Sequence, residues 1–123
     1  MRKITKETAR ALLNGGNITT GNTHVQTVEL PHMCRIGQFF LHGNLIATYE
    51  LEEGVNRLTI SHGNYRVNGQ IKLTKTTKER LNGILKIFGI NWHIFQFRGE
   101  WFIRDFMGKD QLFLNNITFN IDR

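Results

Sequence analysis

Residues 39–49 of the chain read FFLHGNLIATY, and this stretch predicts a β-hairpin around which the rest of the fold can be built. Apolar runs at 38–41 and 45–51 flank His42-Gly43-Asn44, a combination of residue types that tight hairpin turns favour. Strands joined by so short a turn pair in the antiparallel direction. We therefore expect an antiparallel hairpin here, with the rest of a sheet built outward from it.

Strand-like patterns continue on both sides of this hairpin. They cover residues 23–30, 56–61, 65–73, 90–97, 101–106, 112–114 and 117–121. Pro31 ends the first of these segments, because proline cannot donate a hydrogen bond to a β-ladder. A second His-Gly-Asn at 62–64 and Arg98-Gly99-Glu100 are further predicted turns. The pattern predicts a series of hairpins.

Residues 77–88 carry helical spacing instead. Apolar residues recur there at i, i+3, i+4 and i+7, the spacing of one buried helix face: Leu81, Ile84, Leu85 and Phe88. We expect Thr76 to cap this helix and Glu79 to complete a capping box. Gly83 costs about 1 kcal/mol relative to alanine inside a helix, so it marks either close packing or simple tolerance.

A second, shorter helix is predicted over residues 5–14. Thr5 is its expected cap, and Ala9, Leu12 and Leu13 form a narrow apolar stripe. Asn14-Gly15-Gly16 should end it, because these residues accept the left-handed conformation of a helix end. A small basic cluster accompanies this helix: Arg2, Lys3, Lys6 and Arg10.

The predicted elements define an α+β fold, an antiparallel β-meander with two short helices packed on the sheet. The chain has 123 residues, of which 40% are hydrophobic and 11% aromatic. That composition is typical of a globular chain with a hydrophobic core. We expect one domain spanning residues 1–123.

Positive charge is concentrated in one part of the chain. The net charge is +6, and residues 62–88 supply +5 of it, with six basic residues against the single acid Glu79. Residues 1–61 carry six bases against five acids, and residues 89–123 carry four against four. A concentrated basic segment predicts an anionic partner, either nucleic acid or an acidic protein surface.

Nine residues of the basic segment are candidate contacts to nucleic acid or another partner: Tyr65, Arg66, Lys72, Lys75, Thr76, Thr77, Lys78, Arg80 and Lys86. The lysines and arginines could follow a phosphate backbone, and the threonines stand at a helix start, where anions bind. Tyr65 could stack on a base. The alternative is an ordinary solvated face whose charges serve solubility.

Sequence motifs of catalysis are absent. The chain has no Gly-x-Ser-x-Gly, no P-loop and no Cys-x-x-Cys, and its histidines lack a zinc-ligand spacing, although His32 and Cys34 share a strand face. We therefore expect no enzymatic activity, no catalytic residues, no metal site and no cofactor. The single cysteine suits a reducing compartment, and no apolar run approaches the ~20 residues of a membrane helix.

Aromatic residues gather in the last third of the chain, with nine between Phe88 and Phe119. Phe95 and Phe97 share one strand face, and Trp92 and Ile94 share the other. One set must face the helices. The other set is either a partner-binding or dimer surface, or is covered by the C-terminal strands.

Several segments taken in order resemble a known family. They are LLNGGNITTGNTHV (12–25), FFLHGNLIATY (39–49), LTIS (58–61) and TTKERLNGI (76–84), followed by Gln96 and Trp101. Their order over residues 8–103 resembles that of a family of small, mostly uncharacterised proteins of tailed bacteriophages and prophages. The resemblance brings no catalytic residue and no ligand with it.

This resemblance implies a phage-encoded, non-enzymatic binding protein in the host cytoplasm. Such a protein would inhibit or redirect a host machine through its basic face, and an anti-defence, anti-CRISPR-like inhibitor is one form. Its partner would be a host protein or ribonucleoprotein complex, with DNA or RNA as a further possible partner and no membrane. The alternative is a stand-alone nucleic-acid-binding protein with little sequence preference. A homodimer remains an open alternative.

Overall fold

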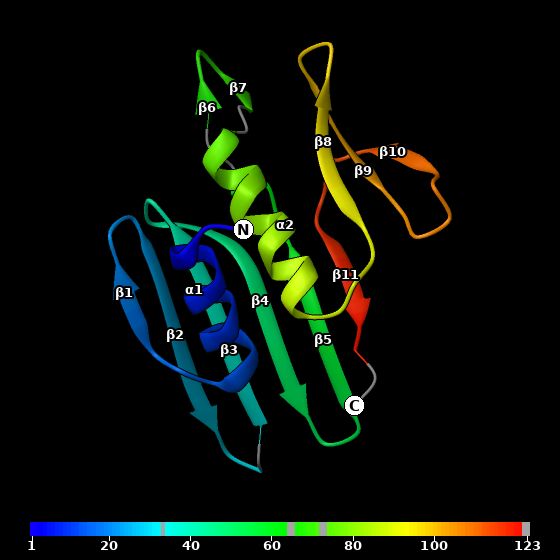
Figure 1. The fold of residues 1–123 in the computed structure, drawn as a ribbon. Helices are drawn as coiled ribbons and strands as arrows, with labels where there is room; N and C mark the ends of the chain where they lie inside the picture. The colour runs from blue at the N-terminus through cyan, green and yellow to red at the C-terminus, as the bar shows by residue number, and fades with distance from the viewer. Residues whose placement is uncertain (33, 64–65, 72–73, 122–123) are drawn as a thin grey trace.

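A six-stranded antiparallel sheet with two helices on one face forms the main body of the chain (Figure 1). The structure is a computed structural model, and it describes residues 1–32, 34–63, 66–71 and 74–121. The sheet order is β1-β2-β3-β4-β5-β11. Its strands are β1 Ile18–Thr20, β2 Thr23–Leu30, β3 Cys34–Leu41, β4 Asn44–Glu52, β5 Val55–Ile60 and β11 Ile117–Asn120. The predicted α+β meander is confirmed.

The hairpin from which the prediction began joins β3 to β4. Leu41 pairs with Asn44, so His42 and Gly43 form a two-residue turn, and both have positive φ, 51° and 78°. Positive φ at both positions matches the right-handed twist of the flanking strands. The predicted strand 23–30 coincides with β2.

A smaller three-stranded sheet is inserted between β5 and β11 in the sequence. It has the order β10-β9-β8, with β8 His93–Phe97, β9 Glu100–Arg104 and β10 Asp110–Leu112. The hairpin predicted from strands 56–61 and 65–73 around the turn 62–64 differs from expectation. In the described part of residues 65–73, two two-residue strands form, β6 Arg66–Val67 and β7 Gln70–Ile71, and they pair with each other rather than with the main sheet. Asn68 and Gly69, both with positive φ, make their turn.

The helices are α1, Lys3–Asn14, and α2, Lys75–Ile87. Neither helix begins with the predicted cap. Thr5 lies inside α1 and is buried, and the cap of α2 is Thr74, whose hydroxyl accepts a hydrogen bond from the Thr77 N–H. Gly15 does end α1 in the left-handed conformation, with φ 80°. The four apolar residues predicted to face inward from α2 are all buried.

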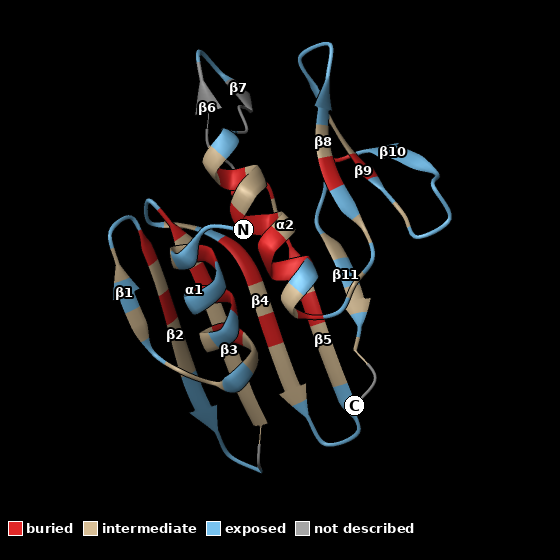
Figure 2. Ribbon diagram, in the orientation of Figure 1, coloured by how far each residue is buried: buried red, intermediate tan, exposed pale blue. Residues whose placement is uncertain are grey.

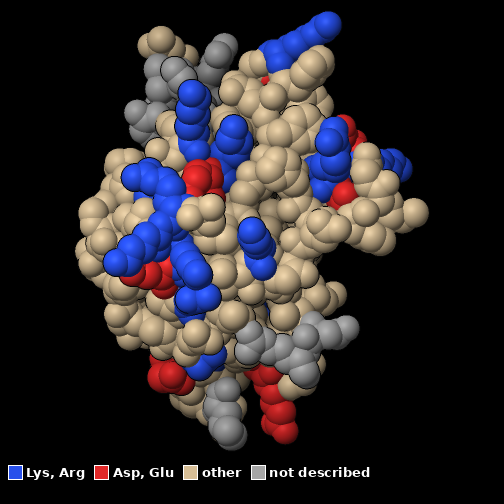
Figure 3. Space-filling view, in the orientation of Figure 1, with Lys and Arg blue, Asp and Glu red and all other residues tan. Residues whose placement is uncertain are grey.

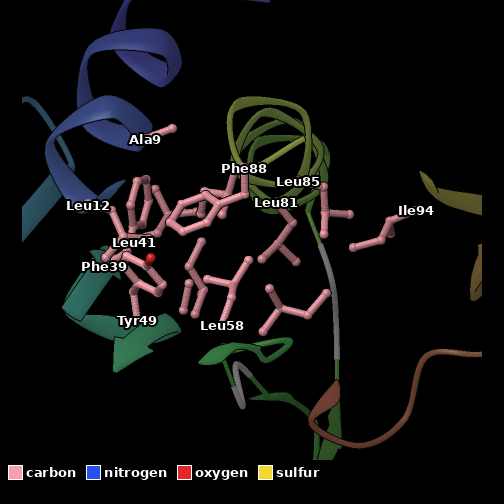
Figure 4. Close-up of a cluster of buried hydrophobic side chains, with 14 of the residues drawn as sticks. Ala9, Leu12, Phe39, Leu41, Tyr49, Leu58, Leu81, Leu85, Phe88 and Ile94 are labelled. Carbon is pink, nitrogen blue, oxygen red and sulfur yellow. The ribbon is translucent and has the colours of Figure 1, made fainter. Parts of the chain in front are cut away.

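The hydrophobic core lies between the helices and the sheet (Figures 2 and 4). Side chains of both helices meet the inner sheet face there, including Ala9, Leu12, Phe39, Tyr49, Leu58, Leu81, Leu85 and Phe88. Burying each leucine or phenylalanine contributes roughly 1.5–3 kcal/mol. The other sheet face is polar, with Gln26 bonded to Gln38 and Thr59 to Thr118 across paired strands. One packed and one solvated face is usual for an antiparallel sheet.

The two helices approach each other closely at Gly83. A Cβ atom at this position would collide with the methyl group of Thr5 on α1. The predicted alternative of close packing at Gly83 is therefore confirmed, and the absence of a side chain lets α1 and α2 lie side by side. Among the described residues, neither helix is long and apolar enough to span a membrane.

Candidate nucleic-acid interface

The outer sides of α1 and α2 together form one basic surface (Figure 3), called the helical face below. Its cations, all at least partly exposed, are Arg2, Lys3, Lys6, Arg10, Lys75, Lys78 and Lys86. The cations at the α1 end and those of α2 are 65 or more residues apart along the chain, from Arg10 to Lys75. Packing of α1 against α2 places them on the same side of the molecule.

The two helices, together with the N-cap residue Arg2, carry the whole net charge of the chain. Residues 1–14 and 75–87 contain eight bases and two acids, a net +6, and the remaining residues contain eight of each, a net zero. The sheet and the hairpins are therefore electrically balanced on average. Charge so concentrated creates a positive potential on one side, which draws anionic partners toward it.

The two acids of the helices weaken this surface very little. Glu7 pairs with Lys3 one turn away, at 3.8 Å, and both side chains are largely exposed. Glu79, whose side chain is 25% exposed, uses both carboxylate oxygens within the protein. One oxygen accepts a hydrogen bond from the Arg2 N–H, and the other accepts from the Thr5 hydroxyl and from Arg80. The Glu79 charge thereby compensates the buried charge of Arg80.

Arg80 corrects the sequence-based list of contact residues. Its side chain is buried, with 1% of the residue exposed. The guanidinium lies 2.6 Å from a Glu79 oxygen and donates to the hydroxyls of Thr5, at 2.8 Å, and Thr23, at 3.2 Å. Arg80 therefore joins α2 to α1 and β2 and does not belong to the outer surface, because its donors are used inside.

The same cluster sets the pKa of Glu79. Partial burial raises the pKa of this carboxyl group, but the hydrogen bonds from Thr5, the Arg2 N–H and Arg80 outweigh that effect. The pKa of Glu79 consequently lies below its ordinary value, and the carboxylate stays ionised at neutral pH. An ionised Glu79 keeps the buried Arg80 charge compensated.

The remaining predicted contact residues fall into three groups. Lys75 and Lys86 are exposed on the helical face, and Lys78 is half-buried with its Nζ 5.8 Å from the centre of the Trp101 ring. Thr76 is partly exposed, whereas Thr77 is buried and its N–H donates to Thr74. Tyr65, Lys72 and the side chain of Arg66 lie outside the described residues.

The N-terminal cations were missed as members of the site, although they had been noted as a cluster. Lys3, Lys6 and Arg10 follow the i, i+3, i+7 spacing of one helix face. That spacing predicts that the three side chains project from the same side of α1, and it is the sequence signal by which they could have been included in the site. The position of α1 beside α2 depends on tertiary contacts, which the spacing does not specify.

A surface pocket of about 670 Å³ opens at the edge of the helical face. Lys78 and Lys86 line it from α2, and Ile90, Asn91 and Trp92 line it from the segment that leads to β8. The pocket has the size of small-molecule sites, which span roughly 300–1,000 Å³. Its lining residues therefore include two lysines and a tryptophan.

The outer face of β8–β9–β10 is a second exposed surface, called the hairpin face below. Phe95 stacks on Phe102 of the paired strand, with ring centres 5.6 Å apart. Arg104 lies over Phe95 at 4.8 Å and Arg98 over Phe97 at 5.2 Å. Phe97 is 56% exposed. Of the two predicted aromatic sets, the one containing Phe95 and Phe97 faces away from the buried core.

Metal-ligating side chains do not gather in the part of the chain that the structure describes, where no three His, Cys, Asp or Glu are placed to hold an ion. The pair suggested by the sequence, His32 and Cys34, is linked through a contact of the Cys34 thiol with the His32 carbonyl, at 3.7 Å.

Comparison with protein-family models matches residues 1–120 to the family described as Kyanoviridae Gp96 protein. No curated protein and no solved structure matches the chain.

Proposed function

Because the chain belongs to the Kyanoviridae Gp96 protein family, a family of phage proteins, we propose that it is a non-enzymatic binding protein of the infected cell. Its helical face docks on the phosphate backbone of nucleic acid, free or held within a host ribonucleoprotein complex. Family membership agrees with the resemblance to tailed-phage proteins noted in the sequence. It names no partner, so the proposal is built on the surface itself.

One observation carries this proposal: the entire net charge of +6 lies on two adjacent helices and the N-cap residue Arg2, and the outer cations among them are at least partly exposed. Lysine and arginine side chains that neutralise phosphates release condensed counterions, which gives affinity without sequence preference. With Glu79 bonded to Arg80 and Glu7 paired with Lys3, little negative charge opposes a phosphate on this face.

Docking of this kind would inhibit or redirect the host machine that uses the covered nucleic acid. A defence complex is one such machine, so anti-CRISPR-like inhibition is the specific form of the proposal. A stand-alone nucleic-acid binder would use the same face without a host protein. The two forms differ in whether a host complex adds affinity beyond that of the nucleic acid alone.

The test is binding of the purified protein to labelled single- and double-stranded DNA and RNA, from about 50 to about 300 mM salt. We expect log K to fall linearly with log salt, with a slope of about 0.9 per phosphate contacted on duplex DNA. A folded Lys75→Glu, Lys78→Glu, Lys86→Glu variant should lose this binding. Arg80, one of the nine contact residues predicted from the sequence, is left unchanged because it is buried. Absence of binding at the lowest salt would refute the proposal.

The hairpin face favours a second candidate, a protein partner held by aromatic contacts. Exposed apolar side chains of this segment include Phe97 and Leu112 on its strands and Phe106 and Met107 in the loop between β9 and β10. Aromatic residues and arginine are enriched in the central contacts of protein interfaces. An interaction anchored there would keep most of its affinity as salt rises, in contrast to docking through the helical face.

A further inference from the structure

We propose that the pocket between α2 and the segment leading to β8 binds one nucleotide unit, with the base against Trp92 and the phosphate on Lys78 and Lys86. This inference deepens the proposed function, on which it rests, by naming what the helical face holds beyond a backbone. The nucleotide is either free in the cell or an unpaired residue of a single strand.

The pocket wall opposite α2 is fixed at both of its ends. At one end, the Ile90 N–H bonds to the Leu85 carbonyl at 2.8 Å, and Gly89 has a φ of 73°. This is the Schellman arrangement, which turns the chain sharply away from the helix. At the other end, the Asn82 side chain accepts from the Ile94 N–H at 2.7 Å and donates to the Ile94 carbonyl at 2.9 Å.

Trp92 is held within this wall by its packing against Phe119. Its ring stands perpendicular to that of Phe119 on β11, with ring centres 5.0 Å apart. Edge-to-face packing of this kind fixes the orientation of an indole ring. A preformed wall needs no ordering when a ligand enters, which favours binding.

The side chains lining the pocket suit the two parts of a nucleotide. Ile90 and Trp92 supply apolar and aromatic surface for a base, and stacking on an aromatic side chain contributes about 1–3 kcal/mol per base. Asn91 and His93, both exposed at the pocket, can hydrogen-bond to base edges. Lys78 and Lys86 supply positive charge for the phosphate.

Charge at the pocket also favours an anion over a neutral ligand. The one acidic residue that lines it is Glu79, and both Glu79 oxygens accept hydrogen bonds from Arg2, Thr5 or Arg80. The positive charges of Lys78 and Lys86 therefore determine the electrostatic potential at the opening of the pocket. An aromatic wall beside such a field distinguishes this pocket from the rest of the helical face, which offers charge alone.

The experiment uses a Trp101→Phe protein, in which Trp92 is the sole tryptophan and reports from the pocket. Its fluorescence is titrated with adenosine monophosphate, a short oligothymidylate, a short DNA duplex and inorganic phosphate. We expect saturable quenching by the mononucleotide or the single strand, and little quenching by the duplex or phosphate. Quenching by the mononucleotide as strong as by the oligomer identifies a free nucleotide, and stronger quenching by the oligomer identifies an unpaired residue of a strand.

A pocket-filling variant separates the pocket from the rest of the helical face. Asn91→Phe, at an exposed position, should weaken single-strand or mononucleotide binding by about tenfold and leave duplex binding within about twofold. The matched control is Asn116→Phe, also exposed but away from this pocket, which should change neither. Thermal unfolding of both variants checks that they fold.

Three outcomes would overturn the proposal that this pocket binds a nucleotide unit. One is duplex binding with no Trp92 quenching by any nucleotide, which would leave the proposed function standing. A second is an equal loss of single-strand and duplex binding in Asn91→Phe. Absence of binding to every nucleic acid, by fluorescence and by labelled probe, would refute the pocket and the proposed function together.

Discussion

The helical face and the hairpin face are both exposed, but they are built from different chemistry. The helices and the N-cap residue Arg2 together carry a net +6. The stretch from β8 to β10, residues 93–112, carries three bases and three acids and exposes aromatic side chains. Charge acts over a Debye length of about 10 Å at 0.1 M salt, whereas apolar contact requires touching surfaces. The contrast teaches that long-range electrostatic attraction and short-range apolar contact belong to separate regions of this small chain.

The same charge reversal made in each of the two regions should have the largest and most unequal effects on DNA binding. Lys75→Glu with Lys86→Glu should weaken duplex DNA binding by about tenfold or more at about 100 mM salt, since two phosphate contacts become repulsions. Arg98→Glu with Lys109→Glu makes the same charge change near the hairpin face and should alter affinity by less than about threefold. Fluorescence anisotropy of a labelled duplex measures both. Equal losses would mean that overall charge, not the helical face, determines binding.

Removing the Glu79 carboxylate should show that the hydrogen-bonded network of Glu79, Arg80 and Thr5 stabilises the packing of α1 on α2. Glu79→Ala leaves the Arg80 charge buried without its carboxylate, and loss of one member of such a pair costs about 3–5 kcal/mol. Glu100→Ala, at the exposed start of β9, should change the free energy of unfolding by less than about 0.5 kcal/mol. Urea unfolding followed by circular dichroism compares them. Similar small changes in both variants would contradict the network.

The low pKa of Glu79 predicts a pH dependence confined to the acid side. A carboxyl whose folded pKa lies below its ordinary value of 4.5 stabilises the fold above that value, and the stabilisation is lost as pH falls through the folded pKa. Compared with the wild type, Glu79→Gln should therefore show a shallower loss of stability between about pH 5 and pH 2. Unfolding midpoints measured across this range test it, and parallel curves would exclude Glu79 as the source.

Close approach of the helices should make Gly83 intolerant of even one methyl group. Gly83→Ala gains helix propensity, but its Cβ collides with Thr5, whose hydroxyl is held by Glu79 and Arg80. We expect a net loss of about 1–3 kcal/mol. Lys86→Ala, exposed on the same helix, should change stability by less than about 0.5 kcal/mol. A stabilised Gly83→Ala protein would show that the helices can separate without cost.

The smallest effect should come from the tip of the hairpin. Arg98 has a φ of 52° in the two-residue turn between β8 and β9, a conformation that asparagine adopts more readily. Arg98→Asn should raise the free energy of unfolding by about 0.5–1 kcal/mol, and Arg98→Ala, which also removes the charge, should not. A gain in both variants would assign the effect to charge rather than to backbone conformation.

Sequence reasoning succeeded where the signal is local. The strand at 23–30 ends at Pro31, and the buried residues of α2 follow from their spacing, because periodicity and turn chemistry act between near neighbours. It failed at the cap of α2 because Thr74 and Thr76 are both capping residue types, and Glu79 was taken as the partner of a nearby threonine. Glu79 instead bonds to Thr5, 74 residues away.

The candidate site was predicted only in part for the same reason. Exposure of Lys75 and Lys86 follows from the helical spacing of α2, and both lie on the helical face. The burial of Arg80 and the addition of α1 to that face depend on how α1, α2 and β2 meet. The position of β11 beside β5, reached after the whole inserted small sheet, has the same origin. No local pattern specifies these contacts.

Lysine labelling with and without bound nucleic acid tests the central claim most directly, because one measurement covers both regions. The protein is acylated at low reagent concentration, alone and with a saturating DNA duplex, and each lysine is quantified by mass spectrometry. We expect protection of Lys3, Lys6, Lys75 and Lys86 on the helical face and unchanged labelling of Lys109, which is exposed beside β10. Protection of Lys109 with free labelling of the helical lysines would contradict the account.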